Sequence, residues 1–483
     1  MNDVPKMPKM PKMPKVPQVI RRILSTQYMV KKNMRYGDIP PSREAYKDSM
    51  RIALPAVAEM VSIALMGMID TVMVGRIGAE AVAAVGLTAQ PRMLFFAAFF
   101  ALNVAVTAIV ARNKGAGNIE SARSCLRHAI LLVAVLGTLA AVLAVSLANP
   151  LMLLAGAQYD TVVMAASYFR ITAFAFPVQI LTGTICAAQR ACGNTKITMK
   201  VNVVAKVISV ALNFLLIEGR FGFPRMEVDG AAWSTVIAAG VAFLLALVSV
   251  LNRDSILRIS RRDNWLFDIP MLRNIGKLTS GGMFEQLALR FGFFAYARVV
   301  ADLGTAEFAA HMIAMQLMGL SFTFADGIGA ATTSLVGQNL GKKRPDLSIM
   351  YGKIGMRLAI ACAAILSTTC ILIRFHFPMM FTDDVEIIAT AAGLILILAC
   401  IMPLQTSQLV MGGSLRGAGD TCFVAITMLI TVGLLRPILG FTLAYPLGLG
   451  LTGAWIAIIF DQLVRLIMLF SRFTRGKWIG LKL

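Results

Sequence analysis

Charged residues are scarce in this chain of 483 residues, since Asp, Glu, Lys and Arg make up only 15% of it. A water-soluble globular protein has about 25%. Hydrophobic residues make up 58%, and they come in runs long enough to cross a bilayer, for which a helix needs about 20 apolar residues. The composition therefore excludes a soluble globular enzyme and predicts an integral membrane protein.

Residues for metal and redox chemistry are also few. The three histidines are scattered, and the seven cysteines show no metal-binding spacing, so we expect free thiols. The sequence has no Walker pattern and no cluster of His or carboxylates that would mark a membrane-embedded enzyme. We expect a protein that is not an enzyme and binds no cofactor, so an ion gradient (H⁺ or Na⁺) is the energy source that remains.

Apolar runs bounded by charges, Gly or Pro predict an all-α integral membrane fold with twelve transmembrane helices. The predicted spans are 52–74, 86–111, 124–147, 162–189, 198–217, 231–252, 278–301, 306–336, 355–373, 386–411, 422–445 and 450–471.

Basic residues outnumber acidic ones by 46 to 25 and are unevenly distributed over the connections between these spans. On one side of the membrane only four fall in the connections, namely Arg76, Arg220, Arg225 and Arg374. Cytoplasmic loops are enriched in Lys and Arg, so we place the opposite side, with both termini, in the cytoplasm. We expect a multi-pass protein of the plasma (inner) membrane with no nucleic-acid partner, whose net charge reflects its topology.

The first residues repeat Met-Pro-Lys and do not resemble a cleaved signal. Regular proline forbids a helix, so we expect residues 1–45 to form a disordered basic cytoplasmic tail, with attachment to anionic lipid headgroups as the functional alternative. The rest divides into a first lobe at 46–252, a cytoplasmic linker at 253–277, a second lobe at 278–471 and a cytoplasmic C-terminus at 472–483.

The two lobes match each other at a constant offset of 226 residues. The matching pairs are Glu59 and Glu285, Gly78 and Gly304, Asn113 and Asn339, Gly115 and Gly341, Pro177 and Pro403, Gln179 and Gln405, Arg190 and Arg416, Gly193 and Gly419, and Thr195 and Thr421. We infer two homologous halves. Because six spans per half is an even number, the halves are related by a pseudo-two-fold axis along the membrane normal, with a cleft between them.

Charges within the spans are the main functional signal, because each costs about 2.5–3.5 kcal/mol at the bilayer centre. Glu59 and Asp70 lie eleven residues apart, within about 20° of one helix face. The span 198–217 carries a polar stripe that must face protein or water. The stripe consists of Asn202, Lys206, Ser209 and Asn213. Lys206 is a natural partner for Asp70 or Glu59.

In the second lobe Glu285 has no basic neighbour one helical turn away, which favours a functional acid over a structural one. For Asp326 the two alternatives stay open. Arg298 and Asp302 are four residues apart and predict a structural ion pair. We expect Pro177 and Pro403 to kink their helices, and Pro55 to sit in a first helical turn, where proline is tolerated.

Several motifs in order resemble the multidrug and toxic compound extrusion (MATE) family over residues 50–470. They are Met68-Ile-Asp-Thr-Val-Met-Val-Gly-Arg-Ile-Gly78, Gln189-Arg-Ala-Cys-Gly-Asn-Thr195, Gly337-Gln-Asn-Leu-Gly341 and Gly413-Ser-Leu-Arg-Gly-Ala-Gly-Asp-Thr421. The resemblance implies a cation-coupled exporter that exchanges inward-moving Na⁺ or H⁺ for a small-molecule substrate, usually an amphipathic cation.

The family's acids in the first and seventh helices match Asp70 and Glu285. Two of its other acids are replaced here, by Asn213 and Gln405. Our candidates for coupling are Asp70, Glu285, Glu59 and Asn213, and a Na⁺ site would use Asp70, Asn213 and Ser209. The positive charge of Lys206 disfavours such a site, so protons are favoured. The candidates for substrate binding are Glu285, Asp70, Lys206, Asn202, Gln405 and Asp326.

Adaptable cleft walls are expected from aromatic and methionine side chains, with core packing as the alternative. The candidates are Met66, Phe95, Phe99, Phe284 and Met315. We expect a monomer in the lipid bilayer. The alternative function is a transporter of lipid-linked precursors or anionic metabolites from the same superfamily, left open by intramembrane cations. These are Lys206, Arg290, Arg298 and Arg436. A major facilitator transporter is less consistent, because its basic motif after the second helix is absent.

Overall fold

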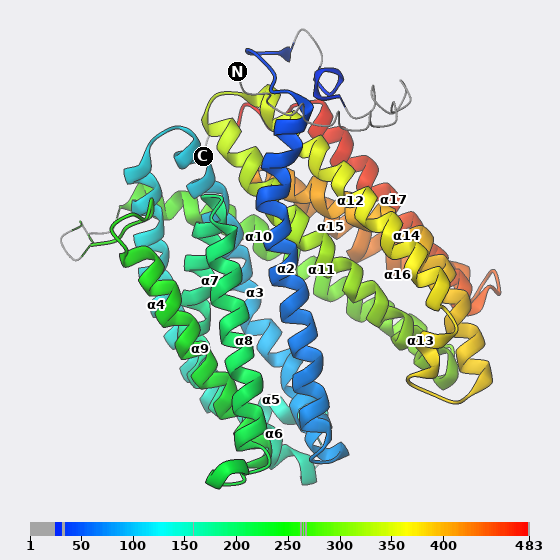
Figure 1. Ribbon diagram of the computed structural model, residues 1–483. Helices are drawn as coiled ribbons and strands as arrows, with labels where there is room; N and C mark the ends of the chain where they lie inside the picture. The colour runs from blue at the N-terminus through cyan, green and yellow to red at the C-terminus, as the bar shows by residue number, and fades with distance from the viewer. Residues whose placement is uncertain are drawn as a thin grey trace, which may run out of the picture.

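The structure is a computed structural model that describes residues 25–30, 34–157, 159–260, 263, 265 and 268–481. All regular elements within these residues are helical (Figure 1). Ten helices are long and apolar enough to cross a membrane, and a helix pair bent by 49° is an eleventh candidate. The charged helix α10, with 33 residues, completes the set of twelve. The predicted all-α fold and its twelve spans are confirmed.

The first lobe contains eight α-helices, in which α6 and α7 form the bent span and α5 is a short connection. They are α2 (Ser42–Gly75), α3 (Ala79–Gly115), α4 (Ile119–Ser146), α5 (Ala148–Leu154), α6 (Tyr159–Phe174), α7 (Phe176–Ala191), α8 (Thr195–Leu216) and α9 (Glu227–Leu251). Short 3₁₀ turns, η1 (Thr26–Tyr28) and η3 (Arg220–Gly222), lie outside these helices.

The second lobe repeats this order. A π-helical stretch, η4, lies within the eleventh span of the chain. Its elements are α10 (Ile269–Ala301), α11 (Thr305–Gly341), α12 (Pro345–Ile373), α13 (His376–Met379), α14 (Val385–Gly417), α15 (Thr421–Met428), η4 (Leu429–Leu435), α16 (Arg436–Ala444) and α17 (Gly450–Thr474).

Two helices begin earlier than their apolar runs predicted. α2 starts at Ser42, so Pro55 lies inside the helix and the prediction that it occupies the first turn is wrong. α10 starts within the expected linker, because the Asp268 side chain accepts a hydrogen bond from the Met271 amide and Pro270 fits the first turn. In both helices a polar segment extends an apolar span beyond the limits that hydropathy alone defines.

The described part of the expected disordered tail, 25–30 and 34–45, is folded against the second lobe. Met29 and Val30 are buried, and Lys353 donates a hydrogen bond to the Met29 carbonyl at 2.7 Å. Arg344 donates to the Asp38 carbonyl at 2.9 Å, and its hydrogen bond with Asp346 raises the pKa of the Arg344 guanidinium. The apolar residues between the basic ones account for this packing. Residues 1–24 and 31–33 of the predicted tail lie outside the described residues.

Proline acts differently in the two lobes. The first-lobe span breaks between α6 and α7, next to Pro177 at the start of α7, as predicted. In the second lobe α14 continues as one helix through Pro403, so the helix is not interrupted there as it is at Pro177. The irregular backbone of that lobe lies instead in η4, which interrupts the following span.

The lobes contact each other closely at one end of the bundle, the end at the top of Figure 1 at which the connections 116–118, 192–194 and 342–344 lie. We call it the basic end. A Cβ on Gly115 of α3 would lie 1.8 Å from the Gln338 carbonyl oxygen, and a Cβ on Gly341 of α11 would lie 2.0 Å from that of Arg112. These two contacts are equivalent at the 226-residue offset. Toward the other end the helices of the two lobes diverge (Figure 1).

Across the same end, Ser334 of α11 donates to the Arg190 carbonyl at 2.8 Å, and Gln338 donates to the Ala191 carbonyl at 2.6 Å. Both acceptors belong to α7 of the first lobe. The basic end is therefore closed by direct backbone contact and by hydrogen bonds between the lobes.

The glycine contact predicts a conformational effect of Gly341→Ala. Overpacking costs about 1–3 kcal/mol, which favours separation of the lobes at the basic end. Cys192, 2% exposed beside this contact, should then react several-fold faster with N-ethylmaleimide in a variant that keeps it as the only cysteine. Gly319→Ala on the same helix, with nothing within 4 Å of the added Cβ, is the matched control. Equal alkylation rates in the two variants would contradict the prediction.

Candidate functional site

The carboxylate of Glu59 on α2 has both an ion-pair partner and hydrogen-bond donors. Its side chain is 1% exposed, and Arg190 of α7 forms an ion pair with it at 3.0 Å. On α8 the hydroxyl of Thr198 and the amide of Asn202 each donate to it at 2.7 Å. Asn202, expected among the substrate ligands, is therefore committed to Glu59. A buried carboxylate with one guanidinium and two neutral donors is a closed structural unit.

The second lobe contains the same ion pair at the equivalent position. Glu285 of α10 pairs with Arg416 of α14 at 2.5 Å, and both residues are 226 positions from their first-lobe counterparts. The additional donors are missing, however. Val424 and Met428 occupy the positions of Thr198 and Asn202. The Glu285 carboxylate is thus held by its arginine without the two neutral donors that complete the first-lobe site.

Asp326 of α11 is the acid that stands apart from these pairs. Its side chain is exposed, although α11 packs between α2 and α3 of one lobe and α12 and α14 of the other. No ion pair within 4 Å joins it to any described residue. Arg416 and Glu285 lie within electrostatic reach of it. Next to it, Gly327 leaves no room for a side chain against Val57 of α2. Asp326 therefore lies beside the inter-lobe contact.

Asp70 of α2 has the partner that the sequence predicted. The Lys206 ammonium lies 3.4 Å from one carboxylate oxygen, and the Asn213 amide donates to the other at 2.8 Å. The Asn213 oxygen accepts from Ser234 instead of facing the acid. A Na⁺ ion at Asp70, Asn213 and Ser209 does not fit this arrangement, because an ammonium and an amide NH₂ occupy the carboxylate and hard cations need oxygen ligands.

The second lobe contains a further cluster of buried charges that the sequence analysis did not predict. Asp461 of α17 is paired with Arg436 of α16 and with Arg465 one turn along its own helix. Arg465 also donates to Thr431 of η4 at 3.0 Å. All three charged side chains are at most 2% exposed. The signal for this cluster was present as an acid and a base four residues apart in an apolar span.

Several expected cleft residues belong to the packed interior. Arg436 is buried against Asp461, so it is not a cation of the cleft. Gln405 is 0% exposed, and its amide donates to the Met318 carbonyl at 3.4 Å. Phe95 and Phe99 belong to the first-lobe core, and Met315 packs against the second-lobe core. Apolar spacing on a helix did not distinguish a cleft face from a core face.

The predicted ion pair and the free thiols agree with the geometry, whereas the cavity that Phe284 lines lies within the second lobe and not between the lobes. Arg298 and Asp302 form an exposed ion pair at 3.1 Å. Phe284 is 69% exposed and lines an apolar cavity of about 300 Å³ between α10 and α15. All seven cysteines are free thiols. Among the described residues, no group of three or more His, Cys, Asp or Glu is arranged to hold a metal ion.

The sequence and the fold resemble known transporters over nearly the whole chain. The sequence model of the MatE family matches residues 55–215 and 282–442. The multidrug resistance protein PmpM of Pseudomonas aeruginosa is 28% identical, with 90% of this chain and 92% of that protein covered.

Two solved structures share the fold. The outward-facing form of a multidrug resistance MATE family transporter of the MOP superfamily has a TM-score of 0.83 at 21% identity, covering 89% of this chain and 95% of that one. A MOP superfamily transporter from Pyrococcus furiosus, described as having a binding pocket of reverse polarity, also has a TM-score of 0.83 at 21% identity, covering 95% and 99%.

The closed environment of Glu59 predicts a strong dependence on Arg190. Arg190→Ala leaves a buried carboxylate without its charge partner and should lower the free energy of unfolding by about 3–5 kcal/mol. Arg298→Ala, which removes the exposed ion pair, should cost less than about 1 kcal/mol. Denaturation in detergent followed by tryptophan fluorescence checks both, and Glu59→Gln with Arg190→Met should recover most of the loss. Similar midpoints for the two single variants would count against a structural role of the pair.

Proposed function

The chain belongs to the MatE family of multidrug efflux transporters, and from this we propose that it is a secondary active antiporter that exports amphipathic organic cations in exchange for protons by alternating access. The basic residues at one end of the bundle support a plasma-membrane topology with both termini in the cytoplasm. In this orientation the basic end is cytoplasmic. The close inter-lobe contact there corresponds to an outward-facing state.

The acid available for exchange is identified by the local charge balance, which is the observation that carries the proposal. Glu59 is neutralised by Arg190, and Asp70 by Lys206. In the second lobe Arg416 contacts Glu285 and lies within electrostatic reach of Asp326, and Arg465, which is paired with Asp461, lies within reach of Glu285. No described cation forms an ion pair with Asp326. The exposed Asp326 is therefore the acid that a proton or the positive charge of a substrate neutralises, next to a Glu285 held by Arg416.

Coupling then follows from competition for one charge. When Asp326 holds a proton, an organic cation finds no carboxylate without an ion-pair partner in this cluster. When the proton leaves, the carboxylate attracts the cation but disfavours burial without it. Because the lobes close at either end only around a neutralised site, each passage carries either the proton or the substrate. The guanidinium and ammonium partners of the other acids favour protons over a Na⁺ cage.

A second candidate function is the transport of an anionic metabolite or a lipid-linked precursor. It draws support from Arg290 of α10, which has no acid partner among the described residues and lies 3.3 Å from the Met93 sulfur. The other three cations considered for such a site are each paired with an acid. Uptake of cationic and anionic fluorescent substrates into proteoliposomes, under separately imposed pH and Na⁺ gradients, distinguishes the two functions.

Asp326→Asn and Glu285→Gln should each abolish proton-driven efflux of a fluorescent cation. Either substitution removes one of the two neighbouring carboxylates, Glu285 and Asp326, that the proposed exchange needs. Transport is measured in everted membrane vesicles at matched expression. Glu386→Gln, an exposed acid in the first turn of α14, is the control and should transport normally. Undiminished efflux by Asp326→Asn would remove this acid from the coupling role.

The Asp70 pair predicts a change in pH dependence. Lys206→Ala leaves Asp70 with the Asn213 amide but without its cation, and so creates a second acid that can exchange protons. The pH optimum of efflux should therefore shift in this variant. Lys200→Ala, an exposed lysine on the same helix, should keep the wild-type profile. Identical profiles for all three proteins would show that the ammonium does not set the charge of Asp70.

A further inference from the structure

A polar cavity of about 350 Å³ lies between the lobes at the basic end, apart from the acids described above. Its walls come from the ends of α3 and α11 and from the first turns of α4 and α10. Each lobe thus supplies two of the four helices. The polar lining consists of Arg112, Asn113, Ser121, Asn274 and Lys343. Among the residues that the structure describes, no acidic one lines the cavity.

The lining of this cavity carries excess positive charge, which a bound anion would neutralise. The Nη1 atom of Arg112 is buried and has no hydrogen-bond partner, and such an orphaned donor costs about 1–3 kcal/mol or more for a charged group. Lys343 adds a second positive charge. Asn113, Ser121 and Asn274 add neutral hydrogen-bonding groups to the same lining. A fork of guanidinium donors with amide and hydroxyl groups matches the oxygens of a phosphate group.

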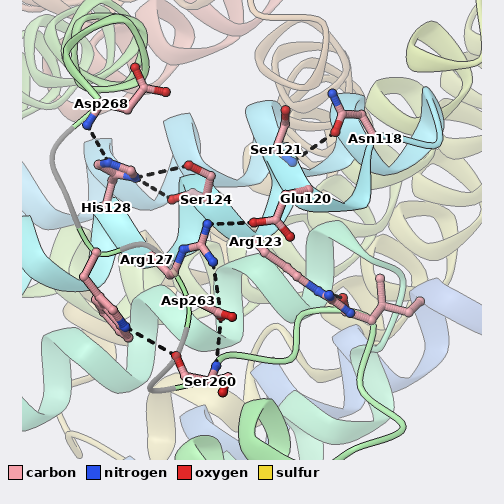
Figure 2. Close-up of polar contacts among 12 residues, drawn as sticks. Asn118, Glu120, Ser121, Arg123, Ser124, Arg127, His128, Ser260, Asp263 and Asp268 are labelled. Carbon is pink, nitrogen blue, oxygen red and sulfur yellow. Dashed lines mark hydrogen bonds and ion pairs between the residues drawn. The ribbon is translucent and has the colours of Figure 1, made fainter.

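The segment that joins the lobes helps to build the cavity. Figure 2 shows it held along the first turns of α4 by three side chains. The His128 Nε2 atom accepts from the Asp268 amide at 2.8 Å, and Arg127 pairs with Asp263 at 3.1 Å. The Ser260 backbone hydrogen bond and Arg127 lower the pKa of the Asp263 carboxyl, so the carboxylate is charged at neutral pH. Arg123 donates to the Ile256 carbonyl at 3.0 Å. These contacts set the start of α10, and with it Asn274, beside α4.

We propose that this cavity binds a phosphate-bearing anion, either an anionic phospholipid headgroup or a soluble diphosphate, and that the anion clamps the two lobes together at the basic end. Because α3 and α4 belong to one lobe and α10 and α11 to the other, the site is complete only when this end is closed. A ligand that binds one state stabilises it. The clamp rests on the proposed alternating access, whereas binding itself does not.

The test uses the full chain in phosphatidylcholine nanodiscs. Sodium diphosphate, compared with sodium chloride at equal ionic strength, should raise the thermal midpoint by at least about 3 °C. The shift should be lost in Arg112→Gln and in Lys343→Gln, so that one misfolded variant does not decide the result. Arg258→Gln, an exposed basic residue of the same end outside the cavity, should keep it. Phosphatidylglycerol nanodiscs form the second arm, in which a shift without diphosphate, lost in Arg112→Gln, identifies the lipid headgroup.

No shift in either arm, or an equal loss in Arg258→Gln, would overturn the site. Bound anion should also slow the alkylation of Cys192 several-fold in the protein that keeps this cysteine alone. A midpoint shift with unchanged alkylation would overturn the clamp. Both readouts are taken without a gradient or a transported cation, so failure of the proposed efflux function leaves them unaffected.

Discussion

A carboxylate buried in a bundle of apolar helices has to be neutralised, and the arrangement of charges in this protein follows from that requirement. Both lobes neutralise such a carboxylate with the same kind of ion pair. An acid on the first helix of the lobe pairs with an arginine near the end of a later helix, 131 residues further along the chain in both lobes. The first lobe adds Thr198 and Asn202 and closes the site. The second lobe lacks them and adds another acid, Asp326, without another contacting cation.

This difference gives the two halves of a duplicated bundle different arrangements of charge. The polar stripe of α8 has Met428, Val432, Leu435 and Leu439 as its second-lobe equivalents. Asp70 and Lys206 therefore neutralise each other in a lobe that has a polar interior, whereas the second lobe concentrates its charge around Glu285 and Asp461. The symmetric glycine contacts keep the lobes together at one end, so the structural role has stayed symmetric while the charge chemistry has diverged.

The sequence predicts most of the fold because span length, basic loops and the repeat are local or periodic signals. It also predicts that Lys206 pairs with Asp70 or Glu59, because charges inside the membrane need a partner, and the structure shows that the partner is Asp70. Arg190 and Arg416 appeared among the repeat matches, but their contacts with Glu59 and Glu285 depend on helix packing that no local pattern encodes. The same holds for the burial of Gln405, which depends on helix packing. For Phe95 and Phe99, burial in a core and exposure to a cleft require the same apolar spacing, so the sequence did not separate the two.

The central claim is that one acid cluster in the second lobe holds either the coupling cation or the substrate. The most direct measurement is displacement of that cation when an organic cation binds to the purified protein, followed as proton release in weakly buffered solution and as release of ²²Na⁺. The account predicts about one proton released per substrate bound at a single exchanging carboxyl, and none in Asp326→Asn. Binding without proton release, release of ²²Na⁺ in place of the proton, or equal proton release from Asp326→Asn would contradict it.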